Sequence, residues 1–258
     1  MQRPKLRDIV TDLRIGVSLV TILPLGPSTQ VSDGDIARAG WTFPVAGLAV
    51  GLLGAAVYAI AAALGLPSGP AALLALASTI IVTGALHEDG LADTADSLGS
   101  RTRDRKLEIM RDSRIGTFGA CALVISLGLR WSALAAMASP RSVLIALLLT
   151  HAAARAGLPL FMALVPPART DGLSAGAGRP AGLNTAIALG LGAIVLAVGF
   201  GPGKAILAVL LLAIIGLAVA WLAIRQVGGQ TGDILGAYEQ FAEIAVLLMA
   251  AAYFHTVV

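Results

Sequence analysis

Seven long apolar stretches dominate this chain and limit what it can fold into. A helix that crosses a bilayer needs about 20 mostly apolar residues, and each stretch supplies roughly that length. The composition agrees, because 57% of the 258 residues are hydrophobic and the mean hydropathy is +0.86. The sequence therefore predicts an all-α, polytopic membrane bundle of about seven transmembrane helices, over roughly 45–64, 70–86, 116–138, 142–165, 183–200, 204–224 and 237–258.

Residues 1–26 differ from these stretches. The opening MQRPKLRDIVTDLR spaces its apolar residues among charges, the pattern of an amphipathic helix on a membrane surface. The next stretch, IGVSLVTILPLG, is too short to span a bilayer and meets Pro24, so we expect an interfacial or re-entrant segment. Because no internal repeat or low-complexity linker is evident, we expect residues 1–258 to form one integral membrane domain.

Positive charge indicates the orientation of the bundle. Of the 18 Lys and Arg residues, fourteen fall on the side that holds the N-terminus, whereas Arg141 and Lys204 fall on the other side. The excess marks the cytoplasmic side, so we expect a multi-pass protein of the cytoplasmic (inner) membrane with its polar site facing the cytoplasm. The net charge is only +3 and no basic face is interleaved with aromatic residues, so nucleic acid is not an expected partner.

A cluster of carboxylates follows the second apolar stretch, in LHEDGLADTADSLGS. On a helix, Asp89, Asp93 and Asp96 would lie within about 60° of one another, and three carboxylates on one face repel unless a cation lies among them. Mg²⁺ takes oxygen ligands and is usually held by one or two carboxylates plus substrate phosphates. We predict that these three aspartates bind Mg²⁺; the alternative is a solvated acidic loop that balances the bases after it.

Basic residues come next, in SRTRDRKLEIMRDSRIGTFGA. Arginine forks and helix N-termini bind phosphate oxygens well, although a positive-inside loop has the same composition. Just beyond the acids, the stretch supplies six basic residues: Arg101, Arg103, Arg105, Lys106, Arg111 and Arg114. Acids for a metal beside bases for phosphates suggest a diphosphate substrate and phosphoryl transfer, carried by a cytoplasmic segment over 87–115.

A second polar cluster lies in RQVGGQTGDILGAYEQFAEIAVLL near the C-terminus. A glycine turn between helices is one explanation of Gly229 and its neighbours. The other is that Gly229 and Asp233, which offers another carboxylate, bind substrate. The glycine turn does not explain Glu239 and Glu243, which enter lipid at a cost unless they are paired or functional. The stretch GGQTGD lacks the G-K-[ST] ending of a nucleotide-binding loop, so it does not predict nucleoside triphosphate binding.

The chain resembles the adenosylcobinamide-GDP ribazoletransferase, or cobalamin synthase, family. The matching stretches follow the family's order and span most of the chain: WTFPVAGLAVGLLG, HEDGLADTADS, RDRKLEIMRDSRIGTFG, AAARAG around Arg155, and GGQTGDILGA. The second and third are the most specific. In three places the chain departs from the family's usual pattern, at Glu88, Ala95 and Ser97. It also lacks the arginine of a T-R-L-P motif near Pro24, so the role of that arginine stays open.

The resemblance implies a Mg²⁺-dependent transfer of the adenosylcobinamide phosphate group from adenosylcobinamide-GDP to the 3′ hydroxyl of α-ribazole or α-ribazole 5′-phosphate. The products would be adenosylcobalamin, or its 5′-phosphate, and GMP. By position, the resemblance implies that Asp89, Asp93 and Asp96 hold Mg²⁺ and that Arg111 and Arg114 bind phosphate. Asp112 and Asp233 would complete the site.

Histidine and the charges within the bilayer complete the candidate residues. His87 adjoins the acidic face and could accept a proton from the attacking hydroxyl; a helix cap or a role in orienting a metal ligand is the alternative. For His151, a hydrogen bond inside the bundle is the simpler expectation. At a rise of about 1.5 Å per residue, Arg155 and Glu243 lie at compatible depths.

An unpaired charge in a low-dielectric bundle is costly, so we expect Arg155 to pair with Glu243 and with Glu239. These residues would form a floor beneath the metal site. Arg130 lies about 21 Å from the cytoplasmic start of its helix, and we expect it to extend to the far membrane surface.

Two other functions fit parts of the pattern. A CDP-alcohol phosphotransferase or prenyltransferase also uses paired aspartates with Mg²⁺, but Asp93 and Thr94 stand where the D-G-x-x-A-R motif of the former has alanine and arginine. A cation-coupled transporter could use membrane-embedded charges, yet the chain shows no pair of related halves. Homo-oligomers or complexes with other corrinoid-pathway enzymes are left open.

Overall fold

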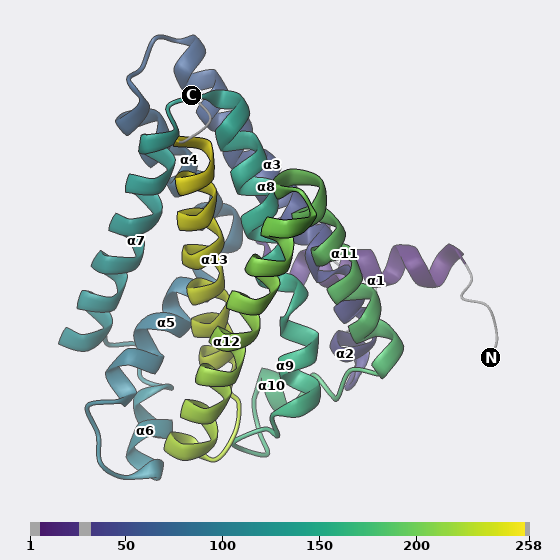
Figure 1. The fold of residues 1–258 in the computed structure, drawn as a ribbon. Helices are drawn as coiled ribbons and strands as arrows, with labels where there is room; N and C mark the ends of the chain where they lie inside the picture. The colour runs from purple at the N-terminus through teal and green to yellow at the C-terminus, as the bar shows by residue number, and fades with distance from the viewer. Residues whose placement is uncertain (1–5, 26–31, 256–258) are drawn as a thin grey trace.

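The protein is all-α in the computed structural model, which describes residues 6–25 and 32–255 (Figure 1). Over these ranges it contains no strand, and a single β-bridge joins Pro167 to Gln230. The predicted fold class is confirmed. The ends of the predicted segment 1–26 lie outside the described residues.

Six of the seven predicted spans are helices long and apolar enough to cross a membrane. They are α3 (Phe43–Ala63), α7 (Thr117–Met137), α8 with α9 (Pro140–Ala156 and Leu158–Leu164), α11 (Gly182–Phe200), α12 (Pro202–Val227) and α13 (Gly232–His255). Helix α3 continues from α2 (Asp35–Ala39) and the short η1 (Gly40–Thr42). Helix α13 begins at Gly232 rather than near 237, which places its glutamates deeper than the sequence predicts.

The outer surface of these helices is apolar. Val198, Leu217 and Val124 are 83%, 72% and 71% exposed. In the most apolar 18-residue stretch of α12, only 17% is buried within the protein. So many large exposed aliphatic side chains would be unfavourable in water. They are the expected surface of a multi-pass membrane protein.

The predicted span over 70–86 becomes two helices with a sharp bend between them. Helix α4 (Ser68–Thr83) and helix α5 (Leu86–Ser97) meet at 87°, and together they form either a broken seventh span or a re-entrant loop. Gly84 and Ala85 make the bend with φ of 62° and 56°. The left-handed region is costly for alanine, by about 1–2 kcal/mol, so the surrounding structure must hold this turn in place. As a result the acidic helix α5 is set across the bundle.

Small residues let the central helices approach closely. A Cβ added at Gly47 or Gly51 of α3 would lie 2.1 Å from the carbonyl oxygen of His151 and 2.6 Å from that of Leu147 in α8. Helices in membranes associate through such small-residue contacts, because apolar side chains gain little by leaving lipid. This contact fixes the α8 residues that carry His151 and Arg155.

Helix α1 (Leu6–Val20) crosses the direction of the long helices in Figure 1. Its buried Asp12 accepts hydrogen bonds from Arg38 and, at 3.0 Å, from Trp41 Nε1. The predicted amphipathic segment is therefore a helix that continues through Val20 and is tied to α2 and η1. Its position on a membrane surface stays a prediction.

The longer polar loops lie at one end of the bundle, around α6 (Arg103–Ile109) and α10 (Leu173–Gly176), and the last turn of α13 lies at the opposite end (Figure 1). This arrangement agrees with the sequence prediction that these loops share one side. It brings α5, the start of α13 and the loop after α9 together.

Candidate active site

Two glycines bring the acids of α5 and α13 together. A Cβ on Gly90 would lie 2.8 Å from the Asp233 carbonyl oxygen and 3.2 Å from Gly236 Cα, and one on Gly236 would meet α5 equally closely. The helices therefore cross backbone against backbone at the HEDG and GDILG motifs. This crossing sets Asp89 and Asp93 beside Asp233, as the sequence predicts for one polar site.

Negative charge is concentrated at this crossing. The charges of Asp89, Asp233, Asp96 and Asp112 all act on Asp93, and that of Asp89 acts on Asp233. Asp233 lies in the first turn of α13, where the helix dipole favours an acid, and its Oδ2 accepts a hydrogen bond from Thr231 Oγ1 at 3.1 Å. Arg169 is 3.5 Å away. Carboxylates that repel one another in this way suit a cation.

Asp96 has a further task in the fold. Its two carboxylate oxygens accept hydrogen bonds from the backbone amides of Gly116 and Gly119, at 2.7 and 2.8 Å. It thereby caps the N-terminus of α7, where neither glycine has room for a side chain. Each oxygen keeps a second lone pair that could face a cation.

The predicted phosphate-binding arginines are paired with acids. Arg111 NH2 is 2.6 Å from both carboxylate oxygens of Asp171, and Arg114 donates to Asp112, with 2.6 Å between Arg114 NH2 and Oδ2. Hydrogen bonds from Arg114 lower the pKa of the Asp112 carboxyl. All four side chains are on loops at the polar end, and a phosphate would have to compete with these carboxylates.

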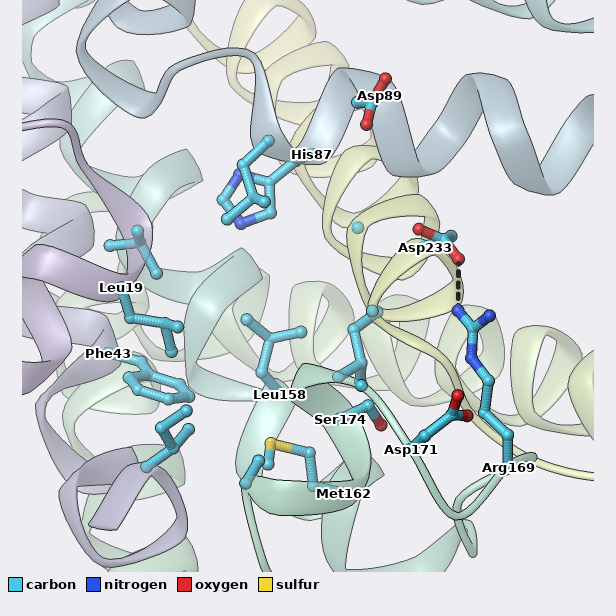
Figure 2. A pocket seen from close by; sticks show the side chains of 18 residues that line it. Leu19, Phe43, His87, Asp89, Leu158, Met162, Arg169, Asp171, Ser174 and Asp233 are labelled. Carbon is cyan, nitrogen blue, oxygen red and sulfur yellow. Dashed lines mark hydrogen bonds and ion pairs between the residues drawn. The ribbon is translucent and has the colours of Figure 1, made fainter. Parts of the chain in front are cut away.

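A pocket of about 260 Å³ opens beside the acids. Figure 2 shows Asp89, Asp233, Arg169 and Asp171 on one side of it and apolar side chains on the other. His87 also lines the pocket, and its Nδ1 faces Arg155 NH2 at 3.5 Å and Glu239 Oε2 at 3.8 Å.

Gly229 holds the loop that carries Arg169. A Cβ there would lie 2.2 Å from the Pro166 carbonyl oxygen, and next to it the Gln230 amide donates to Pro166 and the Ala168 amide to Gln230. Arg103 donates to the carbonyl oxygens of Ala168 and Val227, at 2.6 and 2.8 Å. Gly229 therefore faces the 166–168 backbone, whereas Gly232 and Gly236 line the pocket.

The predicted buried ion pair is confirmed. Arg155 NH1 is 2.9 Å from Glu243 Oε1 and 2.6 Å from Glu239 Oε1, and all three side chains are at most 2% exposed. His151 Nδ1 is 2.5 Å from Glu243 Oε1, which confirms its expected hydrogen bond within the bundle. The floor beneath the metal site stays a prediction, but the contacts of His87 link this ion pair to the pocket.

The prediction for Arg130 is wrong. Its side chain is 2% exposed and pairs with Glu243 Oε2 at 3.0 Å and with Glu88 Oε1 at 2.9 Å. Because α13 begins at Gly232, Glu243 lies about 16 Å into its helix, close to the depth of Arg130. Glu88, the unusual residue before Asp89, supplies the second partner.

Mg²⁺ prefers hard oxygen ligands. Asp89 and Asp233 line the pocket and offer such ligands, and Asp93 lies on the same helix as Asp89, where the charges of both act on it. Within the described residues, the one set of three ligand atoms within 4.8 Å of one another is His151, Glu239 and Glu243. Two guanidinium groups already neutralise that set, so the pocket aspartates fit a cation better, with substrate phosphates completing its ligands.

Several residues of the site did not stand out in the sequence. Arg169 and Asp171 line the pocket, and both belong to the short polar run ARTDG. In the sequence, its position on the Lys- and Arg-rich side of the membrane is the one feature that connects this run with the site. Gln240 donates to Glu88 and accepts a hydrogen bond from Ser126, at 3.3 and 3.1 Å. In the sequence, Gln240 can be recognised as a polar residue next to Glu239 in an otherwise apolar helix, which is the one feature that indicates these buried hydrogen bonds.

A family model described as cobalamin-5-phosphate synthase matches residues 12–251. The chain belongs to this family. A Bradyrhizobium diazoefficiens protein named adenosylcobinamide-GDP ribazoletransferase is 64% identical over 96% of both chains. Proteins of the same name from Mesorhizobium japonicum and Azorhizobium caulinodans are 52% and 46% identical, over 95% of this chain and 94% and 97% of theirs. No solved structure matches the chain. Membership of the cobalamin synthase family favours the transferase interpretation over the CDP-alcohol, prenyl and transporter alternatives.

Proposed function

We propose that this protein transfers the adenosylcobinamide phosphate group from adenosylcobinamide-GDP to α-ribazole or α-ribazole 5′-phosphate. The observation that carries the proposal is that Asp89, Asp233 and Arg169 line one pocket, with Asp93 on the same helix as Asp89, in a membrane-embedded member of the cobalamin synthase family. Acids for a cation and a base for phosphate are the groups that transfer from a diphosphate requires.

The reaction balances as a phosphoryl-group transfer. The 3′ hydroxyl oxygen of the acceptor forms a bond to the cobinamide-side phosphorus, and the bond from that phosphorus to the bridging oxygen breaks. GMP leaves with the bridging oxygen, and the hydroxyl proton goes to a base. The protein must hold the attacking and leaving oxygens on opposite sides of phosphorus and stabilise negative charge on the leaving phosphate.

Asp89, Asp93 and Asp233 would hold Mg²⁺, and Asp96 would add its remaining lone pairs. When bound, the ion would neutralise charge on the diphosphate oxygens. Arg169 lines the pocket and would bind a phosphate oxygen from the loop that Gly229 holds. Arg111 would leave Asp171, and Arg114 would leave Asp112, to bind substrate phosphate as well. Substrate binding would therefore reorganise these exposed loops.

His87 is our proposed proton acceptor. A neutral histidine accepts a proton only at the ring nitrogen that carries no hydrogen. If the hydrogen lies on Nδ1, facing Glu239 Oε2 at 3.8 Å, Nε2 is available to the acceptor hydroxyl. Of the two groups that face Nδ1, Glu239 alone can accept this hydrogen, because the Arg155 guanidinium only donates.

We place the site on the cytoplasmic side of the inner membrane, on the support of the Lys and Arg distribution. A labelling tag at Thr102 would be protected from reagents outside intact cells. Labelling of that tag from outside would overturn this orientation.

The activity is tested with purified protein in liposomes, supplied with Mg²⁺, adenosylcobinamide-GDP and α-ribazole. We expect GMP and a cobalamin product in equal amounts, and neither when the metal is chelated. Separate reactions with α-ribazole and with its 5′-phosphate give the preferred acceptor. Absence of GMP with both acceptors would overturn the proposal.

A further inference from the structure

The pocket has two chemically different halves (Figure 2). Asp89, Asp233 and Arg169 belong to the polar half already described. The other half is lined by aliphatic, aromatic and thioether side chains, among them Leu19, Ile36, Phe43, Leu158, Met162 and Ala177. They come from α1, α2, α3, α9 and the segment after α10, so elements distant in sequence build this half.

We propose that the apolar half binds the aromatic base of the acceptor and thereby selects an apolar base. The inference rests on the proposed function, since α-ribazole is the acceptor named there. Its base is a benzimidazole with two methyl groups and no N–H donor, joined directly to the ribose. With the base among Phe43, Leu158 and Met162, the ribose lies toward the acids, where its hydroxyl must attack.

The guanine of the donor fits this half poorly. Guanine carries a ring N–H, an amino group and a carbonyl, and burial of each without a hydrogen-bond partner is unfavourable. The polar side chains that line the pocket are His87, Asp89, Arg169, Asp171, Ser174 and Asp233. None of the six comes from α1, α2, α3 or α9, which supply most of the apolar half.

The size of the pocket also excludes the corrinoid. A volume of about 260 Å³ is just below the usual range for small-molecule sites, and a corrin ring with its adenosyl group is several times larger than a nucleoside. The corrinoid must therefore lie outside, with its phosphate reaching the acids at the mouth of the pocket. Of the substrate parts, the acceptor base matches the apolar half in both polarity and size.

Met162→Gln tests the proposal, because it keeps the length of the side chain and adds polarity. We expect the KM for α-ribazole to rise about tenfold, with the KM for adenosylcobinamide-GDP unchanged. Leu164→Gln, on the same helix but 68% exposed, is the matched control and should change neither value. Equilibrium dialysis of α-ribazole against each protein, without metal or donor, measures binding independently of turnover and should show the same loss.

Ala177→Val provides a second test if Met162→Gln does not fold, since it fills the pocket and keeps it apolar. This variant should bind the α-riboside of unsubstituted benzimidazole better than α-ribazole. A rise confined to the donor KM would place guanine in the apolar half and overturn the proposal. Unchanged α-ribazole binding in both variants would also overturn it and leave this half to a lipid chain. Binding by the wild type without turnover would instead contradict the proposed function alone.

Discussion

The acids of α5 and α13 form two groups that differ in how their charge is balanced. Inside the bundle, Glu88, Glu239 and Glu243 meet two guanidinium groups at 2.6–3.0 Å. At the pocket, the charges of Asp89, Asp93 and Asp233 act on one another, and one basic residue, Arg169, is 3.5 Å from Asp233. The same two helices thus carry a compensated buried network and an uncompensated open cluster.

This difference separates structural charge from functional charge. A buried ion pair is costly to break, because one partner then remains unpaired in a low dielectric. Repelling carboxylates at a pocket are instead a cost that a bound cation relieves. Loss of a buried charge should therefore reduce stability, whereas loss of a pocket acid should reduce activity without destabilising the fold.

The largest expected effect is on stability, at the buried pair. Arg155→Met or Glu243→Gln should each lower the free energy of unfolding in detergent by about 3–5 kcal/mol. The double variant should lose much less than the sum, because neither charge is then left without its partner. Denaturant titration of the four proteins gives the coupling. Strict additivity of the two stability losses would show that Arg155 and Glu243 act independently. The contrast between a compensated buried network and an open cluster would then lack support.

The next effect is on turnover, at the open cluster. Asp89→Asn and Asp93→Asn should each reduce turnover by about 1,000-fold, or ~4 kcal/mol, with the unfolding midpoint unchanged or raised because repulsion falls. Asp104→Asn, an exposed acid on α6, is the matched control and should keep normal turnover. Near-normal rates for both pocket variants at limiting Mg²⁺ would make these acids ordinary surface charge.

A smaller effect should follow release of Arg111. Asp171→Asn removes an exposed ion pair, which is worth about 0.2–1 kcal/mol, and frees the guanidinium for substrate phosphate. The KM for adenosylcobinamide-GDP should fall by about two- to fivefold, and less so at high salt. Glu108→Gln breaks the comparable exposed pair with Arg105, at 2.7 Å, and should leave the KM as it is. A higher KM for Asp171→Asn would mean that Asp171 itself contacts the substrate or its metal.

The sequence predicted the spans well, because apolar length is a strong local signal. It also predicted the acidic helix and the pairing of Arg155 with Glu243. It could not predict the 87° bend at Gly84 and Ala85, since alanine gives no sign of a left-handed conformation.

The error at Arg130 has a related cause. The apolar pattern predicts a last helix from about 237, because the glycines before it are typical of a loop, whereas α13 begins at Gly232. A shift of a few residues at one helix end moved Glu243 to the depth of Arg130. Local sequence patterns do not predict ion pairs between distant segments, such as that of Arg111 with Asp171.

Binding of Mn²⁺, measured by electron paramagnetic resonance with GDP as the diphosphate probe, tests most directly whether the open cluster holds the metal. The wild type should bind the ion, Asp89→Asn and Asp93→Asn should lose most of the binding, and Glu239→Gln should keep it. Loss of binding in Glu239→Gln, with normal binding in both aspartate variants, would place the ion among His151, Glu239 and Glu243 and contradict the account.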